Sequence, residues 1–330
     1  MQRWKSLADV PADFGPSVVT LGNFDGMHRG HQFLVGEVAR RARARGAKAV
    51  AVTFYPHPVS VHRPDRGLVQ LQPLAERLEA LEAIGLDAVL VAPYSLEFSR
   101  LSPRQFAESY LVEGLRTAEV VVGQDIHFGA DNSGDLGTMR ELGAELGFDV
   151  VAIGDQGDPE DRRQARWSSS AVRQALENGD AAEAARVLGR LHRVVGQVVR
   201  GDGRGRGLGF PTANLGGHVT GLIPQDGVYA GYLIRVGLPE GTPDRVLPAA
   251  ISIGVNPTFA GRERRVEAYV LGRDDLELYG ETVAVDFVAR LRHTLTFSTQ
   301  QALITQMHDD SAAASRVLAG QPATRRRTAL

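Results

Sequence analysis

Two histidines stand three residues apart in a glycine-rich segment, GNFDGMHRGH, which runs from Gly22 to His31. Glycine lets backbone N–H groups come close to a ligand, and an imidazole ring can donate a hydrogen bond to a phosphate oxygen. We therefore interpret this segment as a site for an anion such as a triphosphate, with His28 and His31 as donors. Two alternatives stay open: a tight turn with two surface histidines, and a metal site, which is weaker because zinc usually needs a third nearby ligand.

A second segment with chemical potential, GDGRGRGLGFPTANL, covers residues 201–215. Its basic glycine-rich part contains Gly203, Arg204 and Arg206, which could face phosphate through backbone N–H groups and guanidinium groups. Thr212 and Asn214 follow, and their hydroxyl and amide oxygens are hard ligands suited to Mg²⁺. No G-K-[ST] ends the segment, so it is not a Walker A loop. A flexible basic loop is the alternative interpretation.

The pattern of the first half predicts elements that would position the histidines. SVVTLG at residues 17–22 is typical of a buried strand, and residues 31–46 of a helix that ends at Gly46. Further strands are expected at residues 48–54, 87–93, 118–123 and 148–154, and further helices at residues 73–85, 102–115 and 137–147. This alternation predicts an α/β domain, a Rossmann-like parallel sheet covered by helices. GNFDGMHRGH would then lie at the carboxyl edge of the sheet and at a positive helix N-terminus.

The pattern changes after Leu188. Strand-like runs separated by Gly, Pro and Asp turns predict an antiparallel sheet or β-barrel, and the chain then continues into a C-terminal helix at about residues 298–320. These runs are HRVVGQVVRG, GVYAGYLIRV, VLPAAISIG, RRVEAYVLG and ETVAVDFVARL. We therefore expect two domains, 1–187 and 188–330.

Composition excludes several classes of protein. The 330 residues are enough for two domains, and 43% hydrophobic with 23% charged residues is ordinary for a globular protein. A net charge of −2 gives no sign of nucleic acid or an anionic membrane as a partner. The absence of cysteine excludes disulfides and thiolate sites. No signal peptide and no run near the roughly 18 apolar residues of a membrane span is found, so we expect a cytoplasmic protein without a membrane partner.

GNFDGMHRGH resembles the H-x-G-H signature of the nucleotidyltransferase superfamily, in the form typical of bacterial FAD synthetases. WSSSAVR at residues 167–173 is similar to the second signature of that superfamily, with Ser170 where threonine is usual. TFYPHP at residues 53–58 and VVVGQDIHFGADNSGD at residues 120–135 also resemble family segments. Tyr55 stands where an acidic residue is common, and Ile126 where an aromatic residue is usual. Taken singly, these segments would be an N-capped helix, a proline-bounded loop and an ordinary turn.

In the second half, GDGRGRGLGFPTAN at residues 201–214 resembles the riboflavin kinase signature. GVYAGYL, GVNPTF, RRVEAYVL and LYGETVAVDFVARLR follow in the order of that family, while LRHTLTF lacks the carboxylate that the family often has after LR. The resemblance covers residues 17–310, and the chain is identified as similar to the prokaryotic bifunctional riboflavin kinase/FMN adenylyltransferases. The catalytic glutamate of the family falls on Glu267, whose alternative interpretation is an exposed residue of an alternating strand.

The resemblance implies two ATP-dependent reactions, riboflavin to FMN in the second domain and FMN to FAD in the first. It implies Glu267 as the base of the kinase, and His28, His31 and Arg173 as the charge-bearing groups of the adenylyl transfer. It implies riboflavin, FMN and ATP as partners, Mg²⁺ held by Thr212 and Asn214, and leaves a homo-oligomer open. The residues expected at ATP or phosphate are Gly22, Asn23, Phe24, Asp25, Gly26, Gly30, Ser168, Ser169, Ser170, Gly203, Arg204 and Arg206, and those expected at flavin are Pro56, His57, Pro58, Asp125 and Phe128.

Two other functions are weighed against this one. An adenylyltransferase of nicotinate mononucleotide or phosphopantetheine would share the first domain, but it would not need the FPTAN segment of the second. A flavin-binding protein whose catalysis has decayed is the second alternative. The intact HRGH segment, together with Arg173 and Glu267, argues against decay, and the substitutions at Ser170 and Ile126 are the only hints for it.

Overall fold

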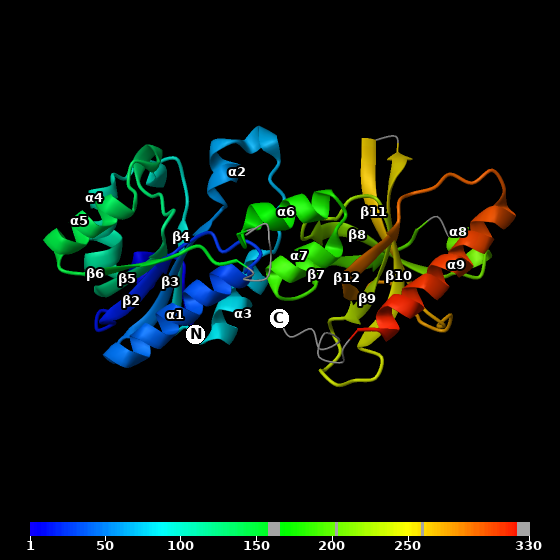
Figure 1. The fold of residues 1–330 in the computed structure, drawn as a ribbon, viewed down its shortest axis with the longest axis horizontal. Helices are drawn as coiled ribbons and strands as arrows, with labels where there is room; N and C mark the ends of the chain where they lie inside the picture. The colour runs from blue at the N-terminus through cyan, green and yellow to red at the C-terminus, as the bar shows by residue number, and fades with distance from the viewer. Residues whose placement is uncertain (158–165, 202–203, 259–260, 322–330) are drawn as a thin grey trace. The chain divides into compact units, whose positions relative to one another are not determined.

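The computed structural model describes residues 1–157, 166–201, 204–258 and 261–321, and the chain divides into two compact units (Figure 1). The first unit contains residues 1–69 and 73–168, and the second contains residues 70–72 and the chain from Ser169 onward. Helices α6 (Ser169–Glu177) and α7 (Ala181–Leu188) belong to the second unit, where α7 packs against barrel strands. The domain boundary expected between residues 187 and 188 stays a prediction.

The first unit is built on a six-stranded parallel sheet, as the alternating sequence pattern predicts. Its strand order is β1-β4-β3-β2-β5-β6, which places β2, the strand before the histidine segment, inside the sheet. The strands are β1 (Gln2–Trp4), β2 (Ser17–Leu21), β3 (Lys48–Tyr55), β4 (Ala88–Pro93), β5 (Thr117–Gly123) and β6 (Asp149–Ile153). Strand β1 is not predicted by the sequence, because its three residues are too few to show a pattern.

Helices cover both faces of this sheet (Figure 1). Helices α1 (Arg29–Arg45) and α3 (Leu74–Ile84) pack on the face to which Val18 of β2 contributes, and the next residue, Val19, points into the opposite core. That second core contains α4 (Pro103–Phe106), the π-helix η4 (Ala107–Gly114) and α5 (Leu136–Leu146). The short elements are η1 (Leu7–Asp9), α2 (Pro58–His62), η2 (Pro64–Arg66), η3 (Phe98–Arg100) and η5 (Ala130–Asn132).

One expected helix is divided. Residues 102–115 form α4 and then η4, in which the helix widens to the π form from Ala107 onward. Ser102 begins the helix as expected, because its hydroxyl accepts from the backbone N–H of Gln105 at 3.2 Å and the Gln105 side chain accepts from the N–H of Ser102. The hydrophobic spacing of this stretch is that of an ordinary α-helix, so the widening has no signal in the sequence.

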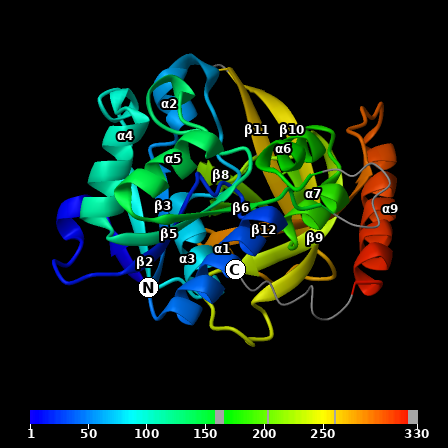
Figure 2. The same cartoon turned by 60° about the vertical axis from the view of Figure 1, so that its left-hand side comes forward.

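The second unit is a closed antiparallel barrel with the strand order β10-β11-β8-β7-β12-β9, which confirms the expected barrel. Its strands are β7 (His192–Val199), β8 (Thr212–Thr220), β9 (Gly227–Arg235), β10 (Val246–Thr258), β11 (Gly261–Val270) and β12 (Thr282–Arg292). The short helix α8 (Arg204–Gly207) precedes β8 in the segment expected to be a loop. The final helix α9 (Gln300–Ala319) runs along the barrel wall (Figure 2). Arg292 of β12 forms an ion pair with Asp310 of this helix, with a nitrogen–oxygen distance of 2.6 Å.

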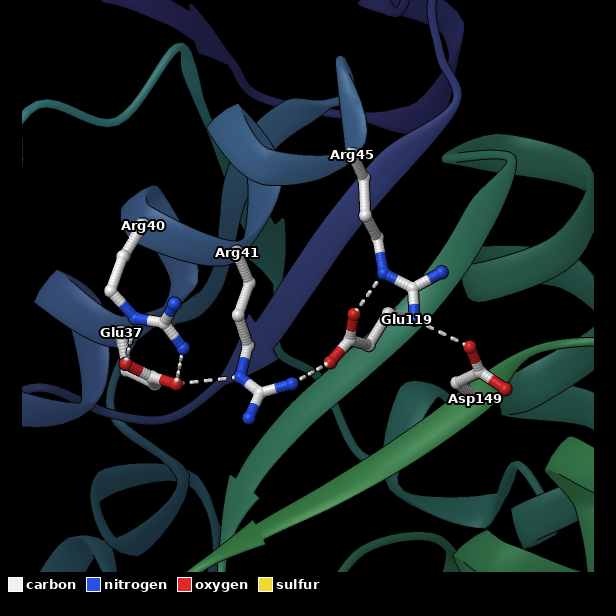
Figure 3. Close-up of polar contacts among 6 residues, drawn as sticks. All are labelled: Glu37, Arg40, Arg41, Arg45, Glu119 and Asp149. Carbon is white, nitrogen blue, oxygen red and sulfur yellow. Dashed lines mark hydrogen bonds and ion pairs between the residues drawn. The ribbon is translucent and has the colours of Figure 1, made fainter.

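A buried ionic network fastens α1 to the sheet of the first unit (Figure 3). Glu119 of β5 has a completely buried side chain and pairs with Arg41, at 2.7 Å, and with Arg45. Arg41 also pairs with Glu37 at 2.7 Å, and Arg45 with Asp149 of β6 at 2.6 Å. A buried carboxylate needs such partners because it has lost its hydration. The network therefore fixes the C-terminal half of α1, the helix whose N-terminus carries the histidine segment.

We expect Glu119→Gln to lower the free energy of unfolding of the first unit by about 1–3 kcal/mol, because two guanidinium groups lose a charged partner. Unfolding in urea followed by circular dichroism measures the effect. Glu145→Gln is the matched control, since Glu145 pairs with Arg104 at the surface and such pairs contribute about 0–1 kcal/mol. Equal losses in the two variants would contradict a stabilising role for the buried network.

The barrel also contains a buried histidine, and we expect this residue to make the stability of the barrel depend on pH. His192 of β7 forms a hydrogen bond through Nε2 with the carbonyl oxygen of Leu222 at 2.6 Å, and burial lowers its pKa to about 4. The unfolded chain binds a proton near pH 6.5, so between about pH 6.5 and 4 it holds more protons than the folded chain. The contribution of His192 to stability should therefore fall by about 3 kcal/mol as the pH drops through this range, and this contribution should be constant above it. Urea unfolding of wild type and His192→Gln at each pH tests this, since the variant lacks this component.

Candidate functional site

The segment between β2 and α1 has a backbone that few residue types adopt readily. Phe24, Gly26 and Met27 all have positive φ angles, of 50°, 83° and 41°. Such a conformation costs a residue with a side chain about 1–3 kcal/mol unless its surroundings enforce it. Phe24 and Met27 are each only 1% exposed, so the core holds both side chains and fixes the backbone between strand and helix. The loop at the carboxyl end of β2 is therefore shaped before a ligand arrives.

His28 and His31 meet at the N-terminus of α1. His28 is the N-cap residue, and its Nδ1 accepts from the backbone N–H of His31 at 3.4 Å. The two rings stack with their centroids 3.7 Å apart. Because Nδ1 of His28 accepts a hydrogen bond, the proton of the neutral ring is on Nε2, and that atom is the donor of the ring. The histidine pair expected from the sequence is thus confirmed as a structural unit at a helix N-terminus.

His31 is kept uncharged by its surroundings. Burial is the main cause that holds its pKa well below the ordinary value, and the charges of His28, Arg77 and Arg166 act in the same direction. Its Nδ1 is buried and has no hydrogen-bond partner among the residues that the structure describes. At neutral pH this ring is therefore a neutral donor or acceptor rather than a fixed positive charge.

Two glycines of the segment lie where a side chain would make tight contacts. A Cβ atom at Gly22 would lie 3.0 Å from the ring of Phe24. A Cβ atom at Gly30 would lie 3.1 Å from the carbonyl oxygen of Trp167 and 3.2 Å from the ring of His28. The guanidinium of Arg29 also lies over the Trp167 ring, 5.4 Å from its centroid. The histidine segment therefore meets the start of the WSSSAVR segment, which stands about 140 residues later in the chain.

A buried arginine forms a hydrogen bond with the segment between β2 and α1, and the sequence analysis did not identify it. Arg77 of α3 has no exposed surface, and its Nη1 donates to the carbonyl oxygen of Asn23 at 2.8 Å and to Oγ1 of Thr53 at 3.3 Å. Burial lowers its pKa, and the nearby charge of Asp25 opposes that shift. The signal was present, because Arg77 stands one turn before the buried Leu81 and next to the buried Leu78, on the core-facing side of its helix. Asn23 Oδ1 is buried without a hydrogen-bond partner among the described residues, so it can accept a hydrogen bond from a ligand.

The second candidate site is a cavity of about 390 Å³ in the barrel wall. Thr212 and Asn214 of β8 and Glu267 of β11 all line it. Asn214 is directly opposite Glu267 in the antiparallel register, and directly paired residues point to the same face of a sheet. The Asn214 amide donates to the hydroxyl and to the carbonyl oxygen of Thr212, both at 3.3 Å. The structure therefore brings together the carboxylate, amide and hydroxyl that the sequence singled out.

Comparisons with known proteins decide the family. The FAD synthetase family model matches residues 10–170, and the riboflavin kinase model matches residues 188–318. A bifunctional riboflavin kinase/FMN adenylyltransferase of Pseudomonas fluorescens is 34% identical over 326 residues, which are 98% of this chain and 100% of that protein. The chain belongs to this family.

Other bifunctional riboflavin kinase/FMN adenylyltransferases agree with this assignment. The protein of Escherichia coli strain K12 is 33% identical over 89% of this chain and 90% of its own, and that of Bacillus subtilis is 31% identical over 91% and 92%. A solved structure from Streptococcus pneumoniae, named a macrolide-efflux protein, matches with a TM-score of 0.83 and 28% identity over 95% of this chain and 98% of its own. In this chain, no helix within the described ranges is long and apolar enough to cross a membrane.

The serines and the arginine expected at the adenylyltransferase site are divided between the two units. Ser168 ends the first unit, whereas Ser169, Ser170 and Arg173 lie on α6 of the second. Their approach to His28 therefore stays a prediction. The other residues that we expected at phosphate, from Gly22 to Gly30, lie in the loop described above and at the start of α1. Their contact with phosphate stays a prediction.

The residues expected at flavin in the first unit follow β3 and β5. Pro58 begins α2, just after Pro56, and His57 caps this helix by accepting from the backbone N–H of Val59 at 3.2 Å. Asp125 pairs with Arg166 at 2.5 Å, while Phe128 is 8% exposed and packs in the core. A flavin contact of these residues stays a prediction.

The kinase cavity fits Mg²⁺ by the chemistry of its donors. Within the described ranges, no group of three or more His, Cys, Asp or Glu side chains could hold a metal ion. Mg²⁺ does not need one, because it is commonly held by one or two protein groups together with substrate phosphates and water. Thr212 and Asn214 supply such oxygen donors beside the cavity. Gly203 and the side chains of Arg204 and Arg206, which we expected at phosphate, lie outside the described part of the structure.

Proposed function

We propose that the chain makes FAD from riboflavin in two steps, each of which uses ATP. The barrel transfers the γ-phosphoryl group of ATP to the 5′-hydroxyl of riboflavin and gives FMN. The first unit joins the adenylyl group of a second ATP to the FMN phosphate and gives FAD and pyrophosphate. The observation that supports this most strongly is the match of both family models, in order, to units that carry the histidine pair and the Glu267 cavity.

In the kinase step the nucleophile is an alcohol, which is almost fully protonated at neutral pH. Glu267 acts as the general base that takes this proton while the oxygen attacks the γ-phosphorus, a role worth about 10²–10⁴ in rate. Thr212 and Asn214 orient the phosphates, and they are the residues that would hold Mg²⁺. When bound, this ion supplies charge neutralisation to the phosphate oxygens. The cavity wall of the barrel holds these groups in a fixed register.

The adenylyl step has a different requirement, because a phosphate monoester with a second pKa near 6 is already mostly a dianion at pH 7. No base is needed, and the site must instead align two anions and neutralise the departing pyrophosphate. Nε2–H of His28 and the N-terminus of α1 supply donors for this purpose. His31 stays neutral and donates or accepts rather than adding charge. Arg173 completes the set of groups that neutralise phosphate.

We further propose a cytoplasmic location, consistent with a chain that has no cysteine. We propose no nucleic acid or membrane partner, in keeping with the net charge of −2, and we leave homo-oligomerisation open. Substrates are riboflavin, FMN and ATP.

The experiment that tests this function is an incubation of purified protein with riboflavin, ATP and Mg²⁺, with the flavins separated by chromatography over time. FMN that appears first and is then converted to FAD supports both activities. FMN alone would contradict the adenylyl step, and FAD made only from supplied FMN would contradict the kinase step. Bound flavin without turnover would favour a binding protein.

A further inference from the structure

Three polar side chains form a row across three neighbouring strands of the barrel. The register pairs Asn214 of β8 with Glu267 of β11, and Glu267 with Ser252 of β10. Residues that are directly opposite in antiparallel strands project to the same face, with Cβ atoms about 4.5–5.5 Å apart. All three residues line the same cavity. Ser252 therefore lies beside the carboxylate of Glu267, on the side away from Asn214.

The order of this row has a consequence for the kinase reaction, and the argument rests on the proposed role of Glu267. In phosphoryl transfer the attacking oxygen, the phosphorus and the leaving oxygen lie roughly in line. Thr212 and Asn214 place the phosphates over β8, and Glu267 receives the proton of the attacking hydroxyl over β11. The carbon chain of the acceptor must then leave in the direction opposite to the phosphate, which is over β10.

The surface of β10 suits the carbon chain of the acceptor. Ser252 is exposed to the cavity, and none of the described residues forms a hydrogen bond with its hydroxyl. Gly254 stands two residues further along the strand, on the same face, and also lines the cavity. A Cβ atom at Gly254 would meet no other atom within 4 Å, so there is open space beside it. This wall therefore combines a hydroxyl that is free to donate or accept with room for a ligand.

We propose that Ser252 binds the acceptor as a polyol: its hydroxyl forms a hydrogen bond with the hydroxyl next to the one that is phosphorylated. For riboflavin this neighbour is the 4′-hydroxyl of the ribityl chain. The contact fixes the position of the ribityl chain, so that its terminal hydroxyl, and not an inner one, faces Glu267. Ser252 is thus a specificity-determining residue for the kinase, distinct from the groups that hold ATP.

The test compares riboflavin with 4′-deoxyriboflavin as acceptors and measures kcat/KM for phosphorylation. We expect the wild type to prefer riboflavin by about tenfold, the size of effect typical of one neutral hydrogen bond. Ser252→Ala should lose about tenfold with riboflavin and show almost no preference between the two acceptors. Ser252→Thr keeps a hydroxyl on a strand and should retain the preference. Ser298→Ala, an exposed serine outside the cavity, is the matched control and should behave as wild type.

A preference for riboflavin that survives in Ser252→Ala would overturn the proposal, as would a wild type that phosphorylates both acceptors equally well. The urea unfolding midpoint of each variant verifies that its barrel is folded. Glu267→Gln is measured in parallel with riboflavin. If that variant keeps full kinase activity, the proposed function of Glu267 fails. If it is inactive while Ser252→Ala behaves as wild type, only the present inference fails.

Discussion

Replacing Glu267 with glutamine is expected to slow FMN formation by about 10²–10⁴-fold and to leave the conversion of FMN to FAD unchanged. Glutamine has nearly the same shape as glutamate, so the cavity and the pairing with Asn214 should be retained. It cannot accept the proton of the attacking hydroxyl. The loss should therefore be mostly in kcat and only slightly in the KM values for riboflavin and ATP.

The measurement is the initial rate of FMN formation from riboflavin, with FAD formation from supplied FMN as an internal standard in the same preparation. Glu277 also lines the cavity, and Glu277→Gln is the informative comparison. A greater loss of kinase rate in Glu277→Gln than in Glu267→Gln would move the role of the base to Glu277. A parallel fall of both activities in Glu267→Gln, with the protein folded, would contradict the division of the two reactions between the units.

Replacing His28 with alanine is expected to have the reverse effect, a loss of FAD formation by about 10²–10³-fold with FMN formation unchanged. The imidazole supplies a donor from Nε2 toward phosphate, and it also caps α1 by accepting from the backbone N–H of His31. Loss of the cap alone costs about 1 kcal/mol of stability. Two effects are therefore combined in this variant, one on the helix and one on the chemistry.

His28→Asn separates the two effects, because asparagine is among the best N-cap residues but has no imidazole. We expect its urea unfolding midpoint to return close to the wild-type value while the rate of FAD formation from FMN and ATP stays low. If His28→Asn recovers activity together with stability, the histidine acts as a helix cap and not as a phosphate donor. The rate of FMN formation from riboflavin serves as the reference in each preparation.

The sequence predicts those elements whose burial gives a recognisable pattern of apolar residues. The apolar runs at residues 17–22 and 118–123 are strands that are buried on both faces, and Gly46 ends α1 in the left-handed conformation that favours glycine. Strand β8 is harder to predict from the sequence, because the two glycines in TANLGGHVT interrupt the alternation of apolar and polar residues. The division of residues 102–115 into α4 and a π-helix also has no pattern of its own.

The sequence also predicts which segments belong to the sites, but not how they meet. The position of His28 at a helix N-terminus follows from a strand, a glycine-rich loop and a helix in succession. The contact of Gly30 with the carbonyl of Trp167 joins residues far apart in the chain, and no local pattern reports it. The row that contains Ser252 depends on strand register. A shift of one residue would turn its side chain to the other face of the barrel, so only the three-dimensional structure reveals it.

Closure of the barrel also sets the order in which this chain can fold. Its first strand, β7, pairs with its last, β12, in a register that joins Gln197 to Thr282. Such distant pairings must overcome the entropy of closing a long loop before they gain any contact energy, and this makes folding slow. During synthesis the first unit emerges before β12 exists, and domains generally fold as units from the N-terminus. The adenylyl-transferring unit should thus fold on the ribosome before β12 has been made, while the kinase barrel is still open.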